Sequence, residues 1–163
     1  MRQPFSPVAH RLGLVTPLEA RVTDDELVAA FEDGRLANEG FHHMDHVRLG
    51  FLFMRRFPAW DALRRFSRAL EGLAAASGKP TLYHETITWA FLLLIRERIA
   101  RWDRTNGRPP SWDEFLADNV DLLEWKDHVL KKYYEEQTLA SDLARTTFLL
   151  PDRGVNPVVT SRR

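Results

Sequence analysis

The chain has 163 residues, enough for one domain with a single substantial core. Lysine plus arginine equals aspartate plus glutamate at 23 each, so charge gives no reason to expect nucleic acid or an anionic membrane as a partner. Cysteine is absent, which excludes disulfides, thiolate metal sites and a cysteine nucleophile. The most apolar stretch, Trp89 to Ile95, is far shorter than the roughly 20 residues that cross a bilayer, and residues 1–17 have no signal-peptide pattern. We expect a soluble, cytoplasmic protein.

The spacing of apolar residues is helical, with no alternating strand pattern and no internal repeat. It predicts an all-α, single-domain bundle of about five to seven helices over residues 23–150. Residues 1–22 are predicted to be an extended N-terminal arm and residues 151–163 a C-terminal tail. In chain order, the predicted helices cover residues 23–35, 43–57, 59–77, 82–104, 111–119, 122–134 and 139–148.

Several helix ends carry recognisable signals. Thr23 to Glu26 and Ser111 to Glu114 are capping boxes, in which a hydroxyl and a carboxylate satisfy the first free amides of a helix. Pro58 ends the second helix because it disfavours helical backbone in the residue before it. Gly78 is suited to a left-handed cap after the third helix.

The third and fourth helices differ in their apolar surface. The third is amphipathic, with an apolar face of Trp60, Leu63, Phe66, Leu70, Leu73 and Ala74 opposite Arg64, Arg65, Arg68 and Glu71. On this pattern, replacing Leu70 by alanine should cost about 2–5 kcal/mol, and replacing Arg65 under about 0.5 kcal/mol. The fourth helix, near 82–104, is apolar nearly all round in its middle and is predicted to be the central buried helix.

Four of the six histidines lie near the predicted starts of two helices. The two clusters are Phe41-His42-His43-Met44-Asp45-His46 and Tyr83-His84-Glu85-Thr86. Two short connections, around Pro58 and Gly78, separate the helices that carry them, so these helices should run parallel with their N-termini at one end of the bundle. We therefore expect His46 and His84 to share one pocket.

Two or three imidazoles with one carboxylate suit zinc, iron, manganese or nickel. His46 and His84 are the first candidate ligands, and the sequence leaves open whether His42 or His43 is the third. Glu85 or Asp45 is the candidate carboxylate ligand or catalytic base. No organic cofactor is indicated. The positive ends of the helix dipoles favour neutral imidazole, which can bind a metal or accept a proton.

Two alternatives use the same residues without a metal. A small-molecule enzyme or binder would use them as acid, base and hydrogen-bonding groups. A structural or interaction protein would use the histidines only to satisfy helix ends, and acidic residues in a first helical turn are favourable for that reason alone. The sequence indicates no reaction. The place of His128 is open, and the arginines at 55, 56, 64, 65 and 68 are interpreted as a solvated face rather than an anion site.

The segments Phe41-His42-His43-Met44-Asp45-His46-Val47-Arg48-Leu49 and Tyr83-His84-Glu85-Thr86-Ile87-Thr88 resemble a pairing found in an uncharacterised bacterial all-helical family. The similarity extends from about Thr23 to Arg153. It implies that the two segments form a unit, and it implies no reaction.

Overall fold

The computed structural model describes residues 23–36 and 42–154, and every regular element in these ranges is helical. The elements are α2 (Asp24–Glu32), α3 (His43–Arg56), α4 (Ala59–Ala76), the short 3-10 helix η1 (Pro80–Leu82), α5 (Glu85–Asn106), α6 (Trp112–Asp118), η2 (Val120–Leu123), η3 (Val129–Lys132), α7 (Glu136–Leu139) and α8 (Asp142–Thr146). The predicted all-α class is confirmed. Within the described part of the chain, no helix is both long enough and apolar enough to cross a membrane. The predicted arm, residues 37–41 and residues 155–163 lie outside the described residues.

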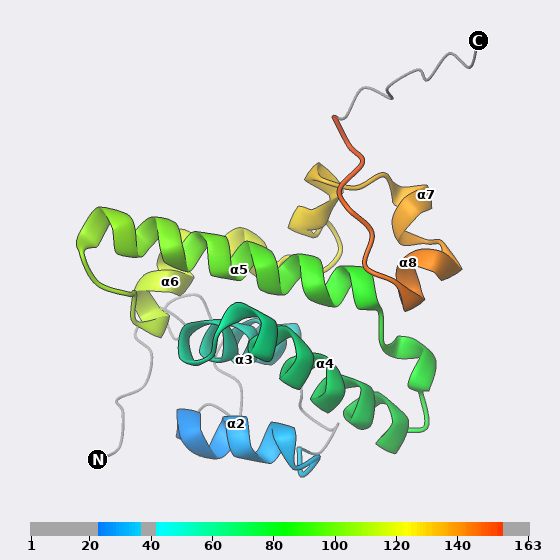
Figure 1. Cartoon of the computed structure of the whole chain (residues 1–163), viewed down its shortest axis with the longest axis horizontal. Helices are drawn as coiled ribbons and strands as arrows, with labels where there is room; N and C mark the ends of the chain where they lie inside the picture. The colour runs from blue at the N-terminus through cyan, green and yellow to red at the C-terminus, as the bar shows by residue number, and fades with distance from the viewer. Residues whose placement is uncertain (1–22, 37–41, 155–163) are drawn as a thin grey trace.

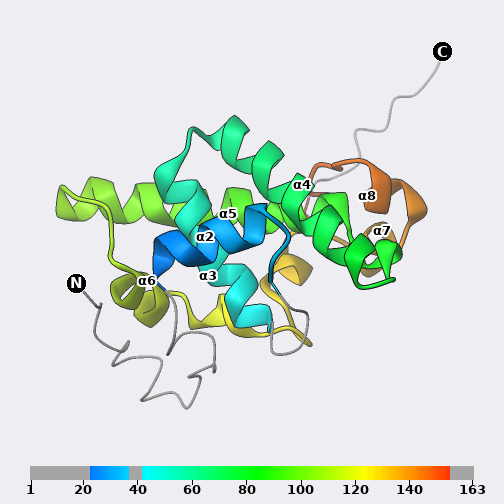
Figure 2. The ribbon, with the colours of Figure 1, turned by 90° about the horizontal axis from the view of Figure 1, so that it is seen from below.

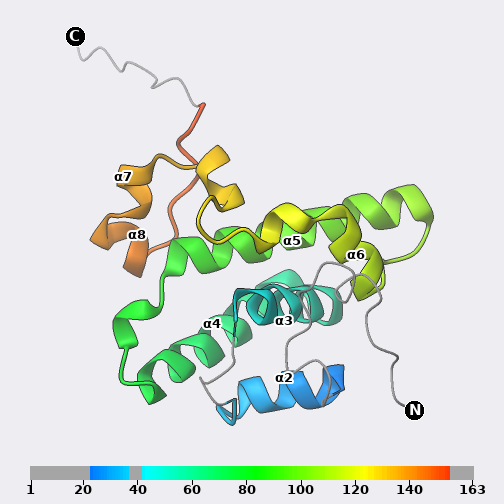
Figure 3. The ribbon, with the colours of Figure 1, turned by 180° about the vertical axis from the view of Figure 1, so that it is seen from behind.

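The long helices are stacked in layers. In Figure 1, α3 and α4 lie between α5 on one side and α2 on the other, while α6 lies near the C-terminal end of α5. The short helices α7 and α8 lie beside the N-terminal end of α5, as the reverse view in Figure 3 also shows. The chain after α6 therefore returns along α5 and covers the end where the histidine clusters were predicted.

The helices α3 and α5 cross instead of running parallel (Figure 2). At the crossing, a Cβ atom added to Gly50 would lie 3.0 Å from Ile95 Cδ1 and 3.2 Å from Leu92 Cδ2. Glycine thus allows a close approach of the two helices that a larger residue would obstruct. The parallel arrangement predicted from the two connections is wrong, because loop length fixes a reversal of direction but not a crossing angle.

An aromatic cluster joins the three helices on the α2 side. The rings of Phe31, Phe53 and Phe66 lie 5.0–5.8 Å apart, centroid to centroid, and each is almost completely buried. Offset and edge-to-face contacts of this kind stabilise beyond the area that they bury. Ion pairs at the rim, Arg48 to Asp24 and Arg56 to Asp25 among them, attach the polar side of α2 to α3.

The helix-end signals in the first two thirds of the chain are confirmed. Thr23 and Ser111 each accept a hydrogen bond from the amide three residues later, and Glu26 and Glu114 bind back to the cap amides. Gly78 follows α4 with a φ of +70°, a left-handed conformation that glycine adopts without strain. The prediction for the fourth helix began three residues too early, because η1 precedes it.

The two last predicted helices are wrong. Residues 122–134 form two short 3-10 turns with an exposed connection between them, and residues 139–148 are broken at Ser141, whose hydroxyl caps α8. Buried Leu122 and Leu130 are each held by tertiary packing, which overrides the helical spacing of this segment. The first residues of the predicted tail also pack: Asp152 accepts a hydrogen bond from the Glu135 amide at 2.9 Å.

Two assignments on α4 need correction. Trp60, predicted to be core, is 67% exposed, and its ring instead meets the edge of Trp89 of α5 at the surface. Arg65, predicted to be solvated, makes two hydrogen bonds to Glu32 of α2 and lies 3.9 Å above the Phe57 ring. Helix α2 thus contacts Arg65 at the edge of the apolar face of α4 as well as Phe66 within that face, which the pattern of a single helix does not reveal.

Candidate functional site

A cavity of about 560 Å³ lies between α3, α4 and the N-terminal half of α5, with one wall from the chain after α6. Its size is typical of small-molecule sites. Most lining side chains are apolar: Val47, Phe66, Leu70, Leu73, Ala74, Leu82, Ile87, Phe91, Leu92, Ile95, Trp125 and Leu139. The polar ones are His43, His46, Ser77, Thr81, Tyr83, His84, Thr88 and Arg145. His46 and His84 therefore share one pocket, as predicted.

His84 is the N-cap of α5, and both of its ring nitrogens are engaged. Nδ1 accepts a hydrogen bond from the Ile87 amide at 3.2 Å, so Nε2 carries the proton and donates to the Leu139 carbonyl at 2.9 Å. The side chain is 8% exposed. His84 thus fastens the segment before α8 to the start of α5, and a metal at either nitrogen would have to break one of these bonds.

His43 stands at the other wall, among aromatic rings. Its Nε2–H donates to the Leu122 carbonyl at 2.8 Å, and its ring centre lies 5.6 Å from that of Phe91 and 5.1 Å from that of Trp125. Burial lowers its pKa, and the bond to Leu122 opposes this in part. His128 lies behind Trp125, at 6.1 Å between ring centres, and also has a pKa lowered mainly by burial. His128 is therefore next to the cavity without lining it.

His46 lies one helical turn before the Gly50 crossing, on the cavity side of α3. Burial lowers its pKa to about 4, and repulsion from His43 adds to this. A neutral imidazole is therefore the stable form at neutral pH. Such a ring offers a hydrogen-bonding group in an apolar wall without adding charge.

His42 and Asp45 have a local role at the start of α3. His42 is exposed and occupies the N-cap position, and its amide donates to Asp45 Oδ2 at 2.7 Å. Asp45 is 1% exposed, and neither residue is among those that line the cavity. Of the two histidines that the sequence left open, the structure brings His43 and not His42 to the site.

Glu85 also faces away from the cavity. One of its carboxylate oxygens accepts a hydrogen bond from the Tyr83 hydroxyl, and Tyr83 lines the cavity while Glu85 lines a separate groove. Burial raises the pKa of Tyr83, and the bond to Glu85 raises it further. The pair therefore forms part of the partition between the two hollows.

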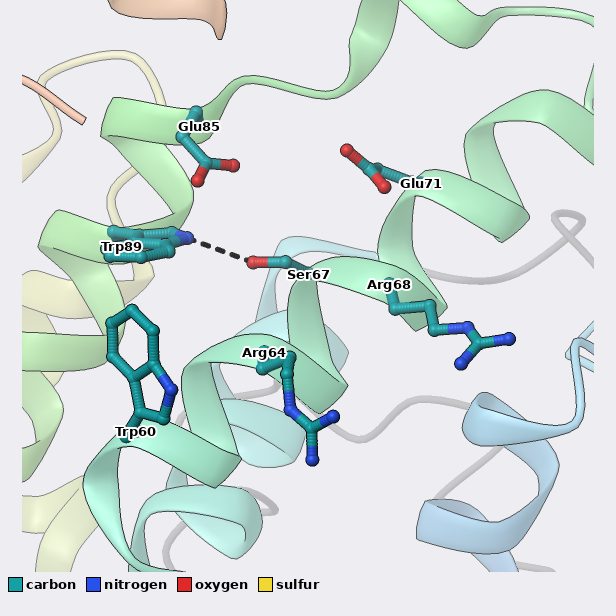
Figure 4. Close-up of a pocket in the computed structure, with 7 residues that line it drawn as sticks. All are labelled: Trp60, Arg64, Ser67, Arg68, Glu71, Glu85 and Trp89. Carbon is teal, nitrogen blue, oxygen red and sulfur yellow. Dashed lines mark hydrogen bonds between the residues drawn. The ribbon is translucent and has the colours of Figure 1, made fainter. Parts of the chain in front are cut away.

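The groove, shown in Figure 4, has a volume of about 310 Å³ and is lined by Trp60, Arg64, Ser67, Arg68, Glu71, Glu85 and Trp89. Trp60 and Trp89 meet edge to face at 5.7 Å, and Trp89 Nε1 donates to the Ser67 hydroxyl at 3.0 Å. The carboxylates of Glu71 and Glu85 face the gap between the two helices, whereas both arginine side chains point away from it (Figure 4). The groove is thus open and mixed in charge.

The described residues contain no group of three or more histidine, aspartate and glutamate side chains arranged to hold a metal ion. The carboxylates Asp45 and Glu85 are turned toward a helix cap and a tyrosine, and His84 uses both ring nitrogens. The metal site and the catalytic roles of Asp45 and Glu85 remain predictions from the sequence.

The fold and the site together define an all-α protein with a cavity to which the chain after α6 contributes one wall. Comparison with protein-family models, with characterised proteins and with solved structures finds no match. The physical properties of the cavity therefore carry the functional argument.

Sequence reasoning missed the part of the site that follows α6. Trp125, Leu139 and Arg145 line the cavity, yet Trp125 lies between η2 and η3, and Leu139 and Arg145 lie in the short helices α7 and α8, none of which carries a motif. Arg145 donates to the Thr81 carbonyl at 2.7 Å, so it connects α8 to the turn before α5. The only signal in the sequence was the excess of apolar and aromatic residues in a segment too irregular for one long helix.

Proposed function

We propose that the protein binds a small, largely apolar molecule in the cavity between α3, α4 and α5, without a metal. The observation that carries the proposal is the combination of a volume of about 560 Å³ with a mostly apolar lining. Water makes few hydrogen bonds in such a space, so an apolar ligand that replaces it gains about 25 cal/mol for each Å² of apolar surface removed from water. A filled cavity would also restore contacts that the walls lack.

The histidines fit this proposal as parts of the wall. His84 and His43 hold backbone carbonyls of the chain after α6, at 2.9 and 2.8 Å, and so keep that wall in place. The His46 ring lines the cavity, and its lowered pKa keeps it neutral at physiological pH, so it adds no charge to the wall. We do not extend the proposal to a reaction, because His43, Tyr83 and His84, which line the cavity, are each engaged in hydrogen bonds within the described part of the chain.

Binding of a neutral fluorophore, phenylnaphthylamine, tests the proposal. The probe should brighten on binding and raise the melting temperature, because it binds only the native state. Ala74 lines the cavity and Ala75 is its exposed neighbour on α4, so Ala74→Phe should weaken binding at least about tenfold while Ala75→Phe leaves it unchanged. Ala74→Leu is a milder second variant if the phenylalanine prevents folding.

Two results would overturn the proposal: no saturable binding to the wild-type protein, or equal weakening by both substitutions. Zinc, manganese, iron and nickel are titrated into chelator-treated protein at pH 7.5 in parallel. Stoichiometric binding of any of them, abolished by His46→Ala and by His84→Ala, would favour the metal site instead.

A further inference from the structure

The charge of the cavity lining narrows the class of ligand. No aspartate or glutamate is among the described residues that line it, whereas Arg145 contributes a permanent positive charge. The helices α3 and α5 also begin at this cavity, with His43 and His84 at or next to their first residues. The positive ends of both helix dipoles lie here, and Asp45 and Glu85 in the first turns offset part of their potential, so Arg145 is the main source of positive charge in the lining. The lining therefore favours a negatively charged group over a positive one.

Arg145 differs from the arginines that join helices elsewhere. Arg48, Arg65 and Arg98 each pair with a carboxylate at 2.6 Å. Arg145 is partly buried, and its hydrogen bond within the described residues goes to a neutral acceptor, the Thr81 carbonyl. A guanidinium has five N–H donors, and the bond to the Thr81 carbonyl uses one of them, so donors remain for a ligand in the cavity. An oxyanion at the cavity would supply both the charge and the acceptors.

We infer that the ligand is a single-chain amphiphile whose oxyanion head binds Arg145 and whose apolar chain lies along Leu70, Leu73, Ile87 and Phe91. This rests on the proposed function, because it assigns the ligand of the same cavity. A carboxylate and a phosphate monoester share the required chemistry, since each presents two oxygens to the fork of a guanidinium. The walls available to the chain are aliphatic and aromatic.

The test compares dodecanoate, dodecyl phosphate and the neutral dodecanol as competitors of phenylnaphthylamine, all below the concentration at which they form micelles. At least one of the two anions should bind about tenfold more tightly than dodecanol, the gain of one charge-assisted contact. Arg145→Gln keeps a donor for the Thr81 carbonyl and should reduce this preference to about twofold or less, while Arg145→Lys should retain part of it. Arg104→Gln, an exposed site near the far end of α5, is the matched control and should change nothing.

The outcomes separate the inference from the proposed function. Equal binding of dodecanol and both anions, or a preference for an anion that persists in Arg145→Gln, would contradict the inference that the ligand has an anionic head group at Arg145. The proposed binding of an apolar molecule in the cavity would still stand. If neither the fluorophore nor any of the three compounds binds, the proposed function itself fails. A preference for the phosphate alone, or for the carboxylate alone, supports the inference and identifies the head group. Melting of each variant confirms that the protein is folded.

Discussion

The cavity and the groove are formed by neighbouring faces of the same two helices, yet charged side chains form a larger share of the groove lining than of the cavity lining. On α4, Phe66 and Leu73 face the cavity, while Trp60 and Glu71 face the groove. The cavity is covered by additional chain from α3 and from the segment after α6, whereas the groove is bounded by α4 and α5 alone. The larger volume of the cavity, about 560 Å³ against about 310 Å³, and its coverage by additional chain distinguish the candidate site from the groove.

Burial by the covering chain also explains why the polar groups of the two hollows differ in their charge. In the cavity, burial lowers the pKa of His46 to about 4, so that charge is excluded from one wall. In the groove, Arg64 has a 71% exposed side chain and an ion pair with Asp61 at 3.6 Å, a contact of little energetic weight in water. A ligand therefore gains more from desolvation in the cavity than in the groove.

The largest expected effect contrasts two aromatic residues of α4. Phe66 is 3% exposed and packs against Phe31 and Phe53 as well as bordering the cavity, so Phe66→Ala should cost about 3–5 kcal/mol. Trp60 lines the groove, and Trp60→Ala should lower the free energy of unfolding by under about 1 kcal/mol. Urea unfolding followed by circular dichroism measures both. Similar costs would show that the groove side is as closely packed as the cavity side.

The second prediction concerns pH. The pKa of His46 falls from 6.5 in the unfolded chain to about 4 in the folded protein, so between these values the unfolded state binds more protons. Stability should therefore decrease as pH falls from 6.5 to 4, by a contribution on the order of 3 kcal/mol. His46→Gln should flatten this part of the profile, and the exposed His42→Gln should leave it unchanged. Parallel profiles for the wild type and His46→Gln would contradict the burial of His46.

The smallest expected losses of unfolding free energy are at Leu70 and Arg65. They differ less from each other than the sequence predicted. Leu70 is only partly buried, because it borders the cavity, so Leu70→Ala should cost about 1–2 kcal/mol instead of the full core value. Arg65→Ala should cost about 1 kcal/mol, since it removes both the Glu32 pair and the contact with Phe57. Arg68→Ala, exposed at the groove, should cost under about 0.5 kcal/mol. A much larger cost for Leu70 would mean that the cavity closes in solution.

The sequence predicted the long helices well, because their signals are local. Capping boxes at Thr23 and Ser111, Pro58 and Gly78 set their ends, and apolar periodicity set their inner faces. It also predicted that His46 and His84 would share a pocket. The crossing at Gly50 and the wall after α6 could not be predicted, since both depend on contacts between residues far apart in the chain.

The same distinction applies to the histidines. Their clustering was visible in the sequence, but their hydrogen-bond partners were not. His43 donates to the carbonyl of Leu122, which lies 79 residues further along the chain, and His84 donates to the carbonyl of Leu139, which lies 55 residues further along. Leu122 lies in η2 and Leu139 ends α7, in segments for which the apolar periodicity predicted longer helices. A spacing that suits metal ligands thus also suits histidines that hold distant backbone.

Nuclear magnetic resonance of the side chains during titration with phenylnaphthylamine tests the central claim most directly. If the cavity is the binding site, ring currents from the probe should shift the imidazole signals of His46 and His84 and the indole signal of Trp125, which all line it. The indole signals of Trp60 and Trp89 in the groove serve as the internal control and should stay in place. Shifts confined to the two groove tryptophans, or no saturable shift at all, would contradict the assignment of the cavity as the ligand site.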